Sequence, residues 1–178
     1  MDLGPLIVDI AGSELTEEDK DLLIHPMIGG IILFSRNYVS KSQIKNLILQ
    51  IKKLSRKNNL LICIDHEGGR IQRFQKEFTK LPSLQSFGNA WMANDSRSIS
   101  LSLQKAFDAS KLLASELKEV GIDFSFTPVL DINWGKSTVI GDRSISIDPY
   151  IVFSIASMII NGLRSEGMKN CGKHFPGH

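Results

Sequence analysis

Cysteine, aromatic residues and blocks of like charge are all scarce in this sequence. Two cysteines, Cys63 and Cys171, in 178 residues cannot build the disulfide framework of a small secreted domain, so we expect a reducing cytoplasm. Lysine plus arginine numbers 21 and aspartate plus glutamate 19, which gives a net charge of +2 without any charged run. This balance gives no indication that nucleic acid or an anionic membrane is a partner.

Long apolar runs are missing as well. The longest one, near residues 28–34, falls far short of the roughly 20 residues that span a bilayer. The first ten residues have no basic segment ahead of an apolar one, as a secretion signal would. With 42% hydrophobic and 22% charged residues, the composition is that of a globular protein. We therefore predict a single cytoplasmic domain over residues 1–178.

Short apolar, strand-like runs alternate with helical patterns along the whole chain. Thr16 with Asp19 and Ser40 with Gln43 have the spacing of capping boxes that open helices. Another predicted helix covers residues 98–120, and residues 74–93 are predicted to be a long loop. The predicted strands are residues 6–10, 31–34, 60–64, 124–130 and 168–172.

This alternation predicts a parallel sheet with helical crossovers, either a doubly wound open sheet or a (β/α)8 barrel. A polar residue follows nearly every predicted strand, which favours a barrel because its active site forms at the carboxyl ends of the strands. No G-x-G-x-x-G or P-loop motif follows a strand, which weakens the nucleotide-binding alternative. We count about five of the eight β/α units of a barrel. The polar residues are Asp9, Ser35, Asp65, Asp131 and Lys173.

The stretch from Ile62 to Arg73 combines a buried-strand pattern with a cluster of charges. Because an unpaired charge in a dry core is costly, we expect the charges after Ile64 to lie at a solvent-facing rim. A salt-bridged turn without function is the alternative. Residues at the ends of other strands would complete a pocket that can donate and accept hydrogen bonds with a polyhydroxylated, partly anionic ligand. The predicted pocket residues are Asp65, Arg73, Arg143, Lys173 and His174.

Four motifs in series resemble those of the family 3 glycoside hydrolases, specifically the branch of β-N-acetylglucosaminidases. They are residues 65–70 (DHEGGR), 126–131 (FTPVLD), 140–144 (IGDRS) and 172–178 (GKHFPGH). The resemblance covers the whole chain in order and spacing. It implies a (β/α)8 barrel that needs no metal or cofactor. It also implies a retaining enzyme, monomeric and cytoplasmic, that removes terminal β-linked N-acetylglucosamine from muropeptides in bacterial cell-wall recycling.

The same resemblance implies roles for individual residues. The sugar contacts match Asp65, Arg73, Arg143, Lys173 and His174, and the family usually has glutamine at the position of His66. The acid/base histidine and the nucleophilic aspartate would lie beyond residue 178, so no catalytic residue is assigned within this chain. The resemblance therefore implies a truncated portion of the enzyme.

Three alternatives remain open at this point. The chain could be an inactive remnant with residual sugar binding, or part of a family 3 β-glucosidase. A phosphosugar barrel, with Lys173 and Arg143 as phosphate ligands, is the third alternative; the lack of a glycine-rich phosphate loop counts against it.

Overall fold

A computed structural model describes residues 3–54, 60–93 and 95–178. Five parallel strands form one sheet in the order β1-β2-β3-β6-β7, which is the order of the chain. A doubly wound sheet reverses its strand order at a switch point, and the described strands contain no such reversal. The architecture is therefore that of a (β/α) barrel. The strands are β1 (Leu6–Val8), β2 (Ile28–Leu33), β3 (Leu61–Ile64), β6 (Phe124–Ser125) and β7 (Lys169–Asn170).

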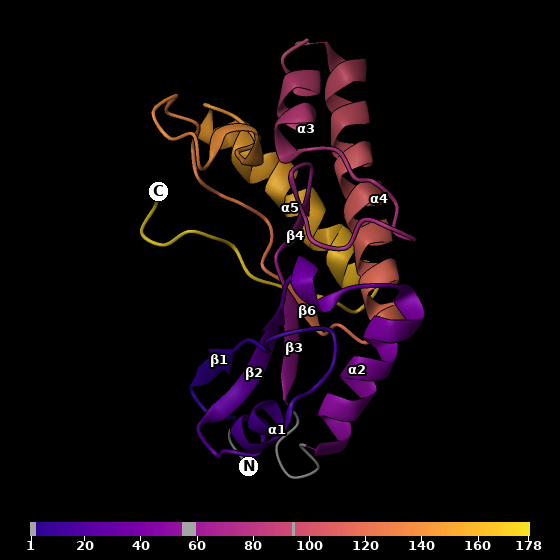
Figure 1. Cartoon of the computed structure of the whole chain (residues 1–178). Coiled ribbons are helices and arrows are strands. Elements are labelled where there is room, and N and C mark those ends of the chain that lie inside the picture. The colour runs from indigo at the N-terminus through magenta and orange to yellow at the C-terminus, as the bar shows by residue number, and fades with distance from the viewer. Residues whose placement is uncertain (1–2, 55–59, 94) are drawn as a thin grey trace.

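Four helices connect consecutive strands of this sheet. In Figure 1, α2 and α4 lie on the same side of the sheet, and α3 and the first part of α4 extend beyond the carboxyl ends of the strands. A two-stranded antiparallel hairpin follows β3 directly. The connecting helices are α1 (Glu17–Leu23), α2 (Lys41–Leu54), α4 (Ser96–Val120) and α5 (Pro149–Ser165). The remaining elements are β4 (His66–Gly68), β5 (Ile71–Gln72), α3 (Leu84–Trp91) and the 3-10 turns η1 (Ser35–Asn37) and η2 (Gly141–Arg143).

Local sequence signals determine where several helices begin and end. Thr16 and Asp19 form both hydrogen bonds of the predicted capping box, each 3.0 Å long. Gly121 ends α4 in the left-handed region at φ 100°, where glycine has no steric penalty. Ser40 accepts a hydrogen bond from the backbone of Gln43 at 3.1 Å, but the Gln43 side chain accepts from Val39, so this capping box is half formed.

The prediction of a long loop over residues 74–93 is wrong, because α3 occupies part of it. Leu84 and Phe87, one helical turn apart, are buried, and the Phe87 carbonyl accepts a hydrogen bond from Ser102 of α4 at 2.7 Å. An isolated helix of this length is marginal in water. Packing against α4, rather than local propensity, therefore stabilises α3.

Strands β6 and β7 are shorter than the predicted strands 124–130 and 168–172. Beyond them, the two segments remain paired in an irregular way toward the carboxyl end of the sheet. The backbone N–H groups of Cys171 and Lys173 donate to the carbonyls of Thr127 and Pro128 at 3.1 and 3.2 Å. Val129 and Lys173 then form an isolated parallel bridge. This pairing fixes the backbone at Lys173.

The core lies between the sheet and its helices. Ile62 and Ile64 of β3 are fully buried, and both cysteines are free, with burial raising the pKa of Cys63 to about 12. In the described ranges, no helix combines the length and apolar character that crossing a membrane would demand.

Replacing Gly162 by alanine tests the contact between α4 and α5. An added Cβ would lie 2.0 Å from the Ser110 hydroxyl and 2.4 Å from the Phe107 carbonyl oxygen. We expect an overpacking penalty of about 3 kcal/mol, partly offset by about 1 kcal/mol of helix propensity. Urea denaturation should therefore show a loss of about 2 kcal/mol. Gly12→Ala, which meets nothing within 4 Å, is the control, and a Gly162→Ala protein as stable as that control would contradict the prediction.

Candidate functional site

Charged side chains from three separate segments meet at the carboxyl ends of the strands. Asp65 follows β3, Glu67 belongs to β4, Arg143 ends η2, and Lys173 and His174 follow β7. Ser125 of β6 holds the start of β4 in place, because its hydroxyl accepts a hydrogen bond from the His66 backbone at 3.0 Å. The five predicted pocket residues lie in this one region. Asp65, Arg73, Lys173 and Arg143 are linked by ion pairs that include Glu67, and His174 pairs separately with Asp131.

Lys173 is the link between two carboxylates. Its ammonium nitrogen lies 2.7 Å from Oδ1 of Asp65 and 2.5 Å from Oε1 of Glu67. The Lys173 side chain is 12% exposed, so solvent screens these contacts less than it would at a surface. Within the described residues these two contacts use two of the three donors of the ammonium group, which leaves one for a ligand.

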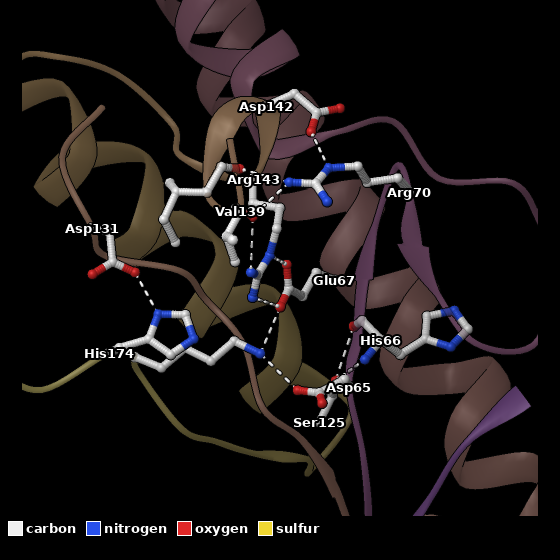
Figure 2. A network of polar contacts seen from close by, with 12 residues as sticks. Asp65, His66, Glu67, Arg70, Ser125, Asp131, Val139, Asp142, Arg143 and His174 are labelled. Atoms are coloured by element: carbon white, nitrogen blue, oxygen red, sulfur yellow. Dashed lines mark hydrogen bonds and ion pairs between the residues drawn. The ribbon is translucent and has the colours of Figure 1, made fainter. Parts of the chain in front are cut away.

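Glu67 also forms a bidentate pair with Arg143. Nε and Nη2 of Arg143 donate to the two carboxylate oxygens at 3.0 and 2.9 Å, and Figure 2 shows the two groups facing each other. These hydrogen bonds raise the pKa of Arg143 above its ordinary value. The expectation that the charges lie at a rim is wrong for Glu67, whose side chain is 1% exposed. Burial is possible because two cations compensate the carboxylate.

His174 pairs with a second buried carboxylate. Its Nδ1 lies 2.5 Å from Oδ2 of Asp131, as Figure 2 shows. Asp131 is 2% exposed in its side chain and His174 is 35% exposed. Both residues line a hollow of about 540 Å³ together with Trp134 and His178. Asp131 thus holds one edge of the imidazole, while the other edge can meet a ligand.

Arg73 completes the set on the opposite side of Asp65. Its Nη2 lies 3.8 Å from Oδ2 of Asp65, and its guanidinium lies 5.6 Å from the centre of the Phe34 ring. No acceptor in residues 3–54, 60–93 or 95–178 reaches the buried Nε of Arg73. Asp65 is therefore flanked by two cations, which orient its oxygens.

The loop before η2 is held by Arg70, a residue that the sequence analysis did not select. Nε of Arg70 donates to Asp142 at 2.8 Å, and its Nη2 donates to the carbonyls of Thr138, Val139 and Ile140 at 3.2, 2.5 and 3.2 Å. These bonds position the turn that carries Arg143.

His66 points away from the network, as Figure 2 shows. Successive residues of a strand face opposite sides, so Asp65 and Glu67 share one side and His66 takes the other. It is 1% exposed and lies 6.2 and 5.9 Å from the ring centres of Phe74 and Phe78. Burial, and secondarily the charge of Arg73, lower the pKa of His66 to about 4. His66 is therefore a core residue and no ligand contact.

Glu67 and Asp131 are the principal site residues without a predicted role. A sequence signal for Glu67 does exist: the period of two along an extended segment puts it on the same side as Asp65. Asp131 was predicted only as a polar residue at the end of a strand, and its contact with His174, which joins positions 43 residues apart, was not predicted.

A parallel sheet in chain order, with a polar hollow at its carboxyl end, defines the class of (β/α) barrel enzyme domains. Residues 4–178 match the description "Glycosyl hydrolase family 3 N terminal domain". The chain belongs to this family. A curated β-hexosaminidase of Nitrosospira multiformis is 47% identical over all 178 residues, which make up 50% of that protein. The chain thus spans about half the length of the curated relatives it matches.

Solved structures agree with this assignment. NagZ from Neisseria gonorrhoeae in complex with N-trifluoroacetyl-D-glucosamine superposes with a TM-score of 0.94 at 48% identity, over 99% of this chain and 50% of that one. A family 3 β-N-acetylglucosaminidase from a Paenibacillus species gives a TM-score of 0.86 at 30% identity, over 97% and 32% of the two chains.

Proposed function

We propose that this chain is the sugar-binding portion of a β-N-acetylhexosaminidase that removes terminal N-acetylglucosamine from its substrate. The observation that carries the proposal is the network in which Asp65, Glu67, Lys173 and Arg143 converge at the carboxyl end of the sheet. Asp65 would accept hydrogen bonds from sugar hydroxyls, and Lys173, Arg143 and Arg73 would donate to hydroxyl and carbonyl oxygens. His174 would donate to or accept from a hydroxyl group.

The charges of this network support a neutral ligand. Three carboxylates, Asp65, Glu67 and Asp131, stand against the three cations Arg73, Arg143 and Lys173. With His174 counted as neutral, the formal charges cancel. A phosphate site needs an excess of positive charge, so this balance disfavours the phosphosugar alternative. Anionic portions of a muropeptide would lie outside this network.

The proposal assigns binding and orientation to these residues. Retaining hydrolysis requires one group that protonates the leaving oxygen and a second that attacks the anomeric carbon. By resemblance to the family these are a histidine and an aspartate beyond residue 178, and no residue of this chain is assigned either role. We further propose that the substrate is a muropeptide of cell-wall recycling and that the enzyme acts in the bacterial cytoplasm as a monomer.

The test measures sugar binding and turnover separately. Calorimetry on the 178-residue chain is expected to detect N-acetylglucosamine at millimolar concentration, with glucose at least about tenfold weaker. The complete gene product is expected to cleave a chromogenic N-acetyl-β-glucosaminide. Cleavage of a β-glucoside in its place would assign the other branch of the family. Sugar binding without turnover by the complete product would identify a remnant, and turnover by the 178-residue chain would contradict our placement of the catalytic groups.

A further inference from the structure

Glu67 differs from Asp65 because it is almost fully buried and both of its carboxylate oxygens accept hydrogen bonds from cations. Its side chain is 1% exposed, whereas that of Asp65 is 23% exposed. One oxygen, Oε1, accepts from both Lys173 and Arg143, and Oε2 accepts from Nε of Arg143. A sugar therefore cannot reach Glu67 without displacing a cation. Its effect on a ligand must pass through Lys173 and Arg143.

The geometry fixes both the direction and the charge of these two cations. A bidentate carboxylate holds the guanidinium plane of Arg143, and the 2.5 Å contact holds the ammonium group of Lys173. The same carboxylate supplies one of the three negative charges that balance the network. Without it, Lys173 and Arg143 would leave the network with one uncompensated positive charge.

We propose that Glu67 is a positioning and specificity-determining residue. It orients Lys173 and Arg143 as hydrogen-bond donors for a neutral pyranose, and it cancels their charge so that anionic sugars are rejected at this position. This inference rests on the proposed function, because the neutral ligand is the N-acetylglucosamine ring. It goes further in naming the group that selects neutral over anionic ligands.

The experiment compares Glu67→Gln with the wild-type chain, at constant ionic strength, for two probes: N-acetylglucosamine and inorganic phosphate. We expect the variant to lose at least about tenfold in sugar affinity and to gain at least about tenfold in phosphate affinity. In a partly buried site, the Coulomb energy between one unit charge and a charged ligand a few ångström away is larger than the free-energy change of a tenfold shift in affinity. Glu119→Gln is the matched control, because it removes an exposed carboxylate that pairs with Lys41 at 2.9 Å, and it should behave as wild type.

The outcomes separate this inference from the proposed function. If Glu67→Gln binds sugar with the affinity of the wild type and gains no phosphate affinity, the role of Glu67 is overturned and the proposed function stays intact. If the wild type binds no sugar but Glu67→Gln gains phosphate affinity, the charge role of Glu67 is supported and the proposed function is overturned. Retention of full sugar affinity by the variant would overturn the positioning role.

Instability of Glu67→Gln would not prevent the test. If the variant is unfolded in sugar-free buffer, phosphate is expected to restore its circular dichroism spectrum by taking the place of the lost carboxylate. Phosphate stabilises many proteins by exclusion from their surface, so the same titration is made on Glu119→Gln. A rescue no larger than the change in that control would overturn the proposal.

Discussion

Acidification from about pH 7.5 to about pH 4.5 is expected to remove about 2–3 kcal/mol of stability through His66 alone. Its pKa is lowered from 6.5 to about 4 in the folded protein, so below pH 6.5 the unfolded chain binds a proton that the folded chain does not. The free energy of unfolding therefore falls as the pH drops through this window. Above about pH 7.5 nearly all of His66 is neutral in both states, and its contribution no longer changes with pH.

The measurement is urea denaturation at both pH values for the wild type and His66→Gln. Glutamine does not titrate, so on acidification the variant should lose about 2–3 kcal/mol less stability than the wild type. Carboxylates that titrate in both proteins contribute equally to the two losses and do not affect their difference. His25→Gln, which removes an exposed imidazole, is the control. Equal acid losses in His66→Gln and wild type would show that His66 is not held neutral among Phe74 and Phe78.

Replacement of Lys173 by methionine is expected to lower the free energy of unfolding by about 3–4 kcal/mol. Methionine fills a similar volume, but Asp65 and Glu67 lose an ammonium group at 2.7 and 2.5 Å. Removal of one partner from a buried ion pair leaves an uncompensated charge, which costs about 3–5 kcal/mol. Arg143 still pairs with Glu67, so we expect the lower part of that range.

The control for Lys173→Met is Lys20→Met, whose ion pair with Glu17 at 2.6 Å is solvent-exposed. Exposed pairs of this kind contribute less than about 1 kcal/mol. Chemical denaturation should therefore separate the two variants by at least about 2 kcal/mol. Similar losses in both would mean that solvent screens the Lys173 contacts as it screens a surface pair.

Local signals were sufficient for most of the fold. The capping box of Thr16 and Asp19 marks the start of α1 both in the sequence and in the structure. The barrel was preferred over an open sheet because polar residues follow successive strands, and the strand order confirms that preference. Short elements were missed: the β4–β5 hairpin and α3 depend on contacts with distant residues such as Ser102, which no local pattern reveals.

Part of the candidate site was predicted from the sequence. Asp65, Arg73, Arg143, Lys173 and His174 were selected by motif, and the structure brings them together; their contacts with a sugar stay a prediction. Glu67 was assigned no role because it is not among the sugar contacts that the resemblance implies, although it was expected to lie at the same solvent-facing rim as Asp65. The burial of Glu67 depends on cations 76 and 106 residues away, which no local pattern reveals.

The backbone pairing that seats Lys173 against Pro128 and Leu130 also makes the site sensitive to chain length. Neighbours on an extended segment point to opposite sides, so a slip by one residue would turn the ammonium away and present Gly172 or His174 in its place. Residues 168–172 should therefore accept almost no insertion or deletion in homologous genes. The number of residues before Lys173, as much as their identity, therefore determines which side chain faces the site.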